Sequence, residues 1–200
     1  DEAFKSCNYL TEAILPDGVT VIGKQAFADC GRLVSVKIGE NVKNIGENAF
    51  YNARNLAEAE YAAVLGEDLT EGTNAFYGAG TNSASGITLT VGEKVERIPA
   101  YLFATSDLTY APDIRRIYFD GTSSCEEIGE KAFAGLKTLA SIDLPVSLLK
   151  IGKAAFDGND GLEVSFESAA VTAGFEDGWD DGLTTQPVFG KNNVISGDYA

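Results

Sequence analysis

A hexapeptide of the form Ile-Gly-x-x-Ala-Phe recurs along this chain and constrains its fold more than any other feature. Full copies occupy residues 22–27, 45–50, 128–133 and 151–156. A period of roughly 20 to 50 residues is typical of stacked repeats, because a single repeat is too short to bury its own apolar side chains. We therefore predict a stack of about seven turns over residues 1–166. Counting partial copies, phenylalanine recurs at positions 4, 27, 50, 76, 103, 133 and 156.

The spacing of the phenylalanines is regular at both ends of the chain and irregular in its middle. The basic step is 23 residues, whereas steps of 26, 27 and 30 residues occur between Phe50 and Phe133. The copy that ends at Phe76 is the most degraded, because Glu71 stands where the other copies have Ile. Stacked repeats expel insertions as surface loops without disturbing the core. We predict such insertions between residues 51 and 125.

A short stretch of alternating side chains follows each phenylalanine and predicts one brief strand per turn. In residues 36–38 and 142–144, two apolar residues flank a charged one, as in a strand with one buried face. Pro16 and Pro145 end two of these strands, because proline cannot donate a hydrogen bond to a ladder. We expect the strands of successive turns to stack in parallel, and the hexapeptide to form a helical or 3₁₀ turn on the other side.

The outward-facing strand residues would line up in two columns when the turns stack. Solenoid proteins typically offer such a surface to their partners. One column holds Glu12, Ser35, Glu58, Arg116 and Ser141, and the other holds Ile14, Lys37, Glu60, Thr90, Tyr118 and Asp143.

The composition argues against catalysis and against binding to nucleic acids. Histidine is absent, which removes the commonest general base and the usual imidazole metal ligand. The net charge of −15 leaves no Lys and Arg clusters to neutralise phosphates. We therefore predict no catalytic residue, no metal site, no cofactor and no nucleic-acid partner.

No apolar run approaches the roughly 18 to 20 residues that cross a bilayer, so we predict no membrane insertion in this piece. The sequence contains no Met. Because translation begins with Met, we expect a processed or excised part of a longer product, without its signal sequence.

The three cysteines are widely separated and are predicted to be core residues. Cys7 and Cys30 occupy the same repeat position, three residues after phenylalanine. Stacked neighbours at this position could reach disulfide distance, but Ala53 and Ala79 fill the same row elsewhere, which favours buried free thiols. Cys125 falls in a row of inward-pointing valines, and we expect no nucleophile there because no base is available.

Two short patterns have a weak likeness to chemical sites. Residues 157–161 begin like a calcium-binding loop, with Asp157 and Asn159 as candidate ligands, but the downstream Glu is missing. We interpret this segment as a solvated turn. Glu58 and Glu60 form a carboxylate pair of the kind that glycosidases use, and we interpret them as solubilising side chains.

The repeat pattern ends after Phe166, and residues 167–200 are predicted to cap the stack. The last turn of a stack exposes its apolar edge and needs a cover. A carbohydrate platform centred on the only Trp is the alternative. The apolar residues available as a cover are Trp179, Val188, Phe189, Val194 and Ile195.

The pattern Ile-Gly-x-x-Ala-Phe-x-x-Cys-x-x-Leu resembles the BspA-like (TpLRR-type) leucine-rich repeats of exported bacterial proteins. The resemblance covers roughly residues 3–166, is fullest at residues 26–33, and extends to a Gly178-Trp179 pair of the kind that often ends such arrays. It implies an α/β repeat solenoid. The expected form is a right-handed leucine-rich-repeat superhelix, with short parallel strands on the concave face and turns or 3₁₀ segments on the convex face. Residues 1–166 would form the array and residues 167–200 its cap.

The resemblance also implies a non-enzymatic protein-interaction or adhesion module, either secreted or displayed on the cell surface. Its partner would be a protein or a glycan, and the sequence leaves its oligomeric state open. Two alternatives remain: a structural spacer of a larger surface protein, and a glycosidase that uses carboxylates alone. The candidate binding face, drawn from the two columns, comprises Lys37, Glu58, Glu60, Arg116, Tyr118 and Asp143.

Overall fold

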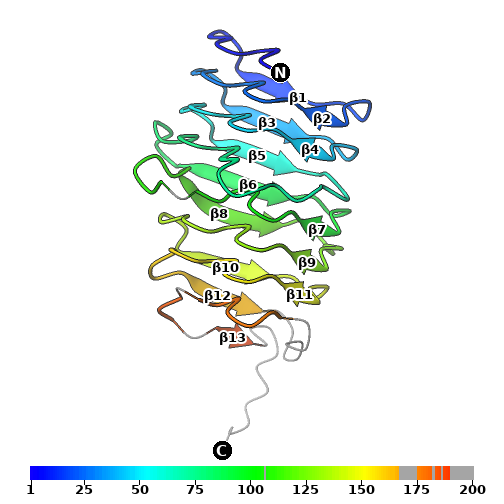
Figure 1. Cartoon of the computed structure of the whole chain (residues 1–200), viewed down its shortest axis with the longest axis vertical. Coiled ribbons are helices and arrows are strands. Elements are labelled where there is room, and N and C mark those ends of the chain that lie inside the picture. Colours follow the sequence, from blue (N-terminus) through cyan, green and yellow to red (C-terminus); the bar gives the residue numbers. More distant parts are fainter. Residues whose placement is uncertain (106, 167–174, 182, 186, 190–200) are drawn as a thin grey trace, which may run out of the picture.

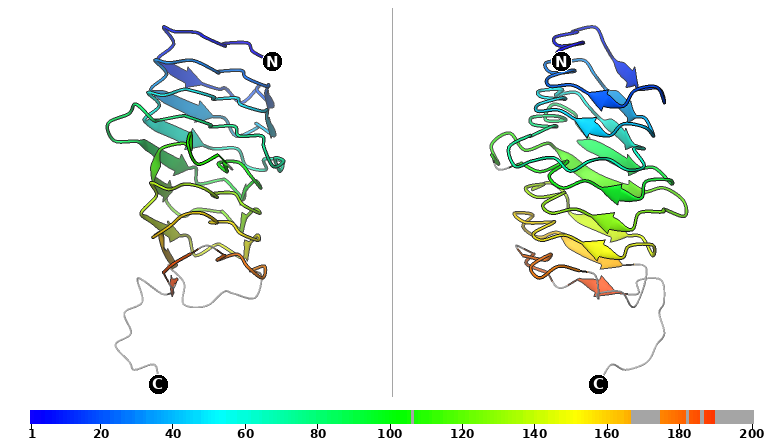
Figure 2. Two further views of the ribbon diagram at one scale, coloured as in Figure 1. Left: turned by 60° about the vertical axis from the view of Figure 1, so that its left-hand side comes forward. Right: turned by 45° about the vertical axis from the view of Figure 1, so that its right-hand side comes forward.

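The computed structural model is a stack of turns joined by parallel strands, and it describes residues 1–105, 107–166, 175–181, 183–185 and 187–189. Successive turns follow one another along the long axis of the molecule (Figure 1, Figure 2). Every strand pair of the described chain is parallel, and no helix occurs among the described residues. The predicted repeat fold is therefore confirmed in its parallel strands, but the prediction of one strand per turn is incomplete, because most turns add a second, two-residue strand.

The strands form two sets of sheets that run along the stack (Figure 1). The longer strands form a five-stranded sheet with the order β1 (Glu12–Ile14), β3 (Ser35–Ile38), β5 (Glu58–Tyr61), β6 (Ile87–Val91) and β8 (Ile114–Phe119). They continue in a three-stranded sheet of β10 (Ser141–Leu144), β12 (Glu163–Phe166) and β13 (Val188–Phe189). Two-residue strands form the other set, as β2 (Val21–Ile22) with β4 (Asn44–Ile45), and as β7 (Arg97–Ile98), β9 (Glu127–Ile128) and β11 (Lys150–Ile151).

The phenylalanines of the repeats stack into one interior column, as their spacing predicts. The centroids of successive rings lie between 4.8 Å apart, for Phe50 and Phe76, and 5.8 Å apart, for Phe133 and Phe156. Each buried ring contributes about 1.5–3 kcal/mol by leaving water, and each ring is shared by two neighbouring turns. The order along the column is Phe4, Phe27, Phe50, Phe76, Phe103, Phe133 and Phe156.

The hexapeptide forms tight turns rather than a helical segment. Gln25 and Asp29 have φ angles of 53° and 58°, and Asn48, the equivalent of Gln25 in the next turn, has 55°. A helical or 3₁₀ segment requires negative φ at every residue, so the prediction of such a segment is wrong. Backbone hydrogen bonds instead join neighbouring turns, as from the Phe27 N–H to the Ala49 carbonyl at 2.7 Å.

The glycine of each hexapeptide lets adjacent turns approach closely. A Cβ at Gly46 would lie 2.5 Å from the backbone nitrogen of Lys24, and one at Gly152 would lie 2.4 Å from that of Glu130. Any side chain at these positions would push two turns apart. Glycine is therefore required by contact, and not by an unusual φ.

The insertions interrupt the two sets of sheets at different places. The two-residue strands do not pair between β4 and β7, where Leu69 is buried and Glu71 is exposed. The longer strands do not pair between β8 and β10. The phenylalanine column runs past both breaks. The insertions therefore alter the surface and leave the core continuous.

The described part of the C-terminal segment packs on the end of the aromatic column. The Trp179 ring meets Phe156 edge to face at 6.4 Å and Phe166 at 5.9 Å. Phe175 also packs on this ring, at 5.4 Å, which favours a covering role over a carbohydrate platform. Of the other residues predicted as a cover, Val188 and Phe189 form β13, and Val194 and Ile195 lie outside the described residues.

Candidate binding face

The strand register arranges the outward residues in two columns, as the repeat alignment predicts. Thr88 joins the first column although the alignment omitted it, because the preceding insertion hides its place in the sequence. On the far side of the break, β10 and β12 pair Ser141 with Glu163 and Asp143 with Ser165. The first column therefore runs Glu12, Ser35, Glu58, Thr88 and Arg116, and the second runs Ile14, Lys37, Glu60, Thr90 and Tyr118.

The part of the face on β1, β3 and β5 is a shallow surface with one ion pair at its centre. The Lys37 ammonium lies 2.7 Å from the Glu60 carboxylate on the neighbouring strand. This contact raises the pKa of Lys37 above its ordinary value. Glu58 and Glu12 lie on the same surface, which encloses a volume of 570 Å³. Three of the predicted binding residues, Lys37, Glu58 and Glu60, therefore come together here.

A β-bulge in β8 turns two successive arginines outward. The register shifts between the pairs Ile87–Ile114 and Thr88–Arg116, so Arg115 is the extra residue. A bulge places two residues opposite one and re-aims their side chains. The Arg115 guanidinium lies 2.8 Å from the carboxylate of Asp113, two residues before it in the chain. This carboxylate raises the pKa of Arg115 above its ordinary value.

Arg116, by contrast, carries a guanidinium that no described residue engages. It is exposed, and within the described chain no carboxylate forms an ion pair with it and no acceptor takes a hydrogen bond from its side chain. The nearest carboxylate in its column, Glu58, lies two strands away, or about 9.6 Å at the usual strand spacing. Arg116 is therefore a cation that can accept an external anion.

An open groove of 690 Å³ lies where β8 and β10 fail to pair. In place of a backbone ladder, the Thr138 hydroxyl donates a hydrogen bond to the Ile114 carbonyl at 3.1 Å. Two apolar side chains are presented here, since Tyr118 is 54% exposed and Val146 is 61% exposed. The groove is lined by Arg116 and Tyr118 from β8, Thr122 and Ser123 from the loop that follows, Thr138, and Ser141, Asp143 and Val146 from β10 and its flanks.

Asp143 lies in the wall of the groove but is tied to the next strand. Its carboxylate accepts a hydrogen bond from the Ser165 hydroxyl on β12, on the side away from β8. The structure thus brings together Arg116, Tyr118 and Asp143 in one groove, separately from Lys37, Glu58 and Glu60. Sequence reasoning missed Thr122 and Val146, although an apolar residue directly after the strand-ending Pro145 is a usable signal of an exposed side chain.

The cysteines are part of the core and are poorly suited to act as nucleophiles. All three are free in this structure, and Cys30 and Cys125 are fully buried. Burial raises the pKa of Cys30, and raises that of Cys125 to about 12. The Cys30 thiol donates a hydrogen bond to the Phe4 carbonyl at 3.0 Å, so it links two adjacent turns.

Asn159 does the same work as Cys30 at the equivalent repeat position. Its side-chain amide donates to the Phe133 carbonyl at 2.9 Å and accepts from the Leu136 N–H at 2.6 Å. Asn159 is fully buried, so the prediction of a solvated turn is wrong for this residue. Because both ends of the amide are engaged, Asn159 is not placed to coordinate calcium.

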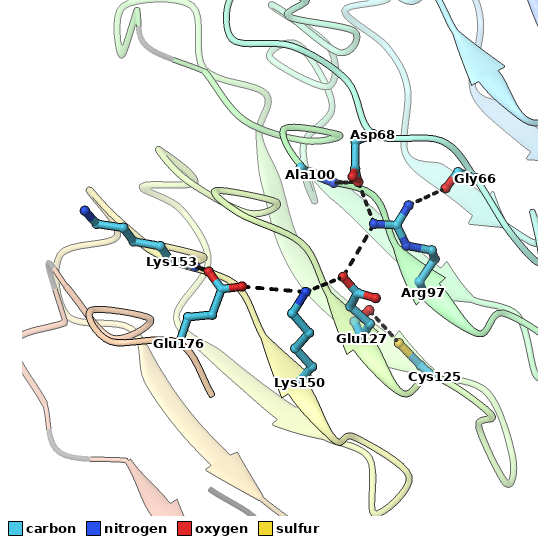
Figure 3. A network of polar contacts seen from close by, with 9 residues as sticks. All are labelled: Gly66, Asp68, Arg97, Ala100, Cys125, Glu127, Lys150, Lys153 and Glu176. Atoms are coloured by element: carbon cyan, nitrogen blue, oxygen red, sulfur yellow. Dashed lines mark hydrogen bonds and ion pairs between the residues drawn. The ribbon is translucent and has the colours of Figure 1, made fainter. Parts of the chain in front are cut away.

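A ladder of ion pairs follows the second set of sheets (Figure 3). Arg97 on β7 lies 2.6 Å from Asp68 and 3.5 Å from Glu127 on β9, and Lys150 on β11 lies 3.1 Å from Glu127 and 3.6 Å from Glu176. These side chains join consecutive turns. We interpret the ladder as structural, because each of its cations already has two partners.

Two features bear on metals and membranes. Within the described ranges, no group of three or more Cys, Asp or Glu side chains is arranged to hold a metal ion. The same ranges contain no helix that is long and apolar enough to cross a bilayer.

Comparisons with known proteins identify one matching family model and several solved structures, among them the following two. A family model described as "BspA type Leucine rich repeat region (6 copies)" matches residues 1–112 and 110–174. A leucine rich cell surface protein from Faecalibacterium prausnitzii A2-165 is 28% identical, with a TM-score of 0.53 over 84% of this chain and 42% of its own. A leucine-rich repeat protein from Bacteroides ovatus ATCC 8483 is 21% identical, with a TM-score of 0.40 over 97% of this chain and 56% of its own. The chain thus spans less than two thirds of either neighbour, and no curated protein matches it.

Proposed function

We propose, since the chain belongs to the family of BspA-type leucine-rich repeat proteins, that it is a non-enzymatic interaction or adhesion module of a bacterial cell-surface or secreted protein. We place its main contact at the groove between β8 and β10. The observation that carries this proposal is the unpaired Arg116 beside the exposed Tyr118 in that groove. The description of the Faecalibacterium neighbour as a cell surface protein supports the location.

The chemistry of the groove supports recognition of a partner. Tyr and Arg are the residue types that most often dominate binding energy at interfaces, because they combine a large contact area with directional hydrogen bonds. Val146 extends this contact across the break, and Thr122 extends it on the side of β8. On the β3–β5 part of the face, by comparison, Lys37 and Glu60 already satisfy one another. A partner would gain less there, because it would have to disrupt an existing ion pair.

We propose further that residues 1–166 form a right-handed solenoid with its longer strands on the concave face, and that residues 167–200 are its cap. The packing of Trp179 on Phe156 and Phe166 supports the cap. Removal of residues 167–200 should lower the melting temperature and cause aggregation, because it exposes the last phenylalanine of the column. A truncated chain as stable and as monodisperse as the full chain would contradict the cap.

The function is tested by binding to immobilised extracellular-matrix proteins and to a glycan array. We expect specific binding that Tyr118→Ala reduces at least tenfold. Tyr9→Ala is the matched control, because Tyr9 is 87% exposed at the other end of the stack. Equal loss in both variants, or none in either, would remove the groove from the proposal.

Absence of binding to every matrix protein and glycan would favour the structural spacer, in which the stack only holds other domains apart. The glycosidase alternative depends on Glu58 and Glu60, and Glu60 is bound to Lys37 on an open face. Hydrolysis of a glycan that is lost in Glu58→Gln would revive it.

A further inference from the structure

We infer that the groove between β8 and β10 binds a saccharide bearing one carboxylate, with Arg116 holding the carboxylate and Tyr118 stacking on the sugar ring. This inference rests on the proposed function and specifies the chemistry of its ligand. It follows from the charge, the size and the lining of the groove.

The charge of the groove selects a single anion. Its charged lining residues are Arg115, Arg116 and Asp143. Arg115 is neutralised by Asp113 at 2.8 Å, whereas Arg116 has no ion-pair partner within the described chain. A guanidinium binds a carboxylate through two parallel hydrogen bonds, which makes it the preferred side chain for this group. Within the described chain, Arg116 is thus the only cation of the lining that is left to bind a ligand, so the groove offers one contact for a carboxylate.

The size of the groove suits an oligosaccharide better than a folded protein surface. Its volume of 690 Å³ lies within the range of about 300–1,000 Å³ that is usual for small-molecule clefts. The groove runs along the break in the sheet. Arg116 and Tyr118 line one wall, and Ser141 and Val146 line the other.

The lining of the groove is rich in hydroxyl groups, which favours a sugar over an acidic peptide. Hydroxyls both donate and accept, and so match the hydroxyls of a sugar. The exposed ring of Tyr118 offers a face on which the C–H bonds of a sugar ring can pack, with its O–H free to hydrogen bond at the edge. The hydroxyl-bearing lining residues are Tyr118, Thr122, Ser123, Thr138 and Ser141. The hydroxyls of Thr122 and Thr138 already donate to Glu93 and Ile114, and that of Ser123 accepts from the Cys125 N–H, so these three would contact a sugar through their remaining hydrogen-bonding capacity.

The test uses a xylotriose that carries one 4-O-methylglucuronic acid, with isothermal titration calorimetry as the readout. Its carboxyl-reduced form is the neutral control. A capped peptide Gly-Gly-Glu-Gly-Gly carries the same single carboxylate without a sugar. We expect the acidic saccharide to bind at least tenfold more tightly than either control.

Variants of the groove assign the contact. Arg116→Gln should weaken binding of the acidic saccharide by about tenfold or more, because it removes a charge-assisted hydrogen-bonded pair. Arg32→Gln is the matched control, since Arg32 is exposed at the other end of the stack over Tyr9, and should change nothing. Unchanged melting temperatures would show that each variant is folded.

Three results would overturn the inference. In the first, the parent chain binds the acidic and the reduced saccharide with equal affinity. In the second, Arg116→Gln binds the acidic saccharide as tightly as the parent chain does. In the third, the parent chain binds the peptide as tightly as the acidic saccharide. If any of these occurs while Tyr118→Ala still abolishes binding to a matrix protein, the proposed function stands and only the ligand chemistry is wrong. If Tyr118→Ala also leaves binding to the matrix protein unchanged, the groove is not the binding site and both proposals fail.

Discussion

The turns that repeat every 23 residues and the turns that carry insertions bury the same aromatic column but present different surfaces. In the regular turns, β1, β3 and β5 pair in register, and Lys37 forms an ion pair with Glu60 on the neighbouring strand. Around the inserted turns, the ladders break between β4 and β7 and between β8 and β10. The second break opens the groove that holds Arg116 and Tyr118. Periodicity thus fixes the core, and departures from it create the surface that can bind a partner.

The strongest test of a shared core is to remove one ring from each region. Phe27→Ala in a regular turn and Phe103→Ala between the insertions should each cost about 3–5 kcal/mol, because each leaves a cavity between two stacked rings. Phe4→Ala should cost far less, since Phe4 is 46% exposed at the end of the column. Urea unfolding measures all three. A Phe27→Ala variant that unfolds like the parent chain would contradict the stack, and a much smaller loss in Phe103→Ala would mean that the insertions interrupt the core.

Sequence reasoning captured what repeats and missed what is local to one turn. The ring column and the outward columns follow from spacing alone, because stacking forces equivalent residues into contact. The helical interpretation of the hexapeptide failed because Gln25 and Ala154 adopt left-handed φ angles of 53° and 52°, for which neither residue type is a signal. Asn48 and Asn52 do carry that signal, since Asn enters this region more readily than most residues.

The groove could be predicted only in part. Arg116, Tyr118 and Asp143 were found because they belong to the outward columns. The break beside them was not, because nothing in the alternating pattern marks the place where β8 and β10 fail to pair. Asn159 was misjudged for a related reason. A polar residue in an apolar row of the repeat is expected to be exposed. The burial of Asn159 becomes clear only from its hydrogen bonds to the backbone of Phe133 and Leu136, which the sequence does not reveal.

A second test concerns the closeness of the regular turns. Gly152→Ala should destabilise the chain by about 1–3 kcal/mol, because the new Cβ meets backbone that can move only by separating two turns. The contact is with Glu130, at 2.4 Å. Gly31→Ala is the control, since its Cβ would meet nothing within 4 Å, and it should be neutral or slightly stabilising. Comparing the melting temperatures of the two variants separates the cost of the Cβ contact from the effect of alanine on the backbone entropy of the unfolded chain. Equal melting temperatures would mean that the turns are not tightly stacked.

The smallest effect is expected at the paired charges of the regular face. Lys37→Gln should change the free energy of unfolding by less than about 1 kcal/mol, because both partners are partly exposed and water screens the pair. The Glu60 carboxylate raises the pKa of Lys37 above 10.5. A raised pKa means that the folded state holds the proton more tightly, so the contribution is fully present below pH 10.5 and is lost as the pH rises through the folded value. The unfolding free energies of the parent chain and the variant should therefore converge as the pH passes the raised pKa of Lys37 in the folded state. Binding of the acidic saccharide to the groove at pH 7 should stay the same in both. A Lys37→Gln variant that lost this binding would show that the regular face and the inserted turns act as one surface, which the separation of the two grooves argues against.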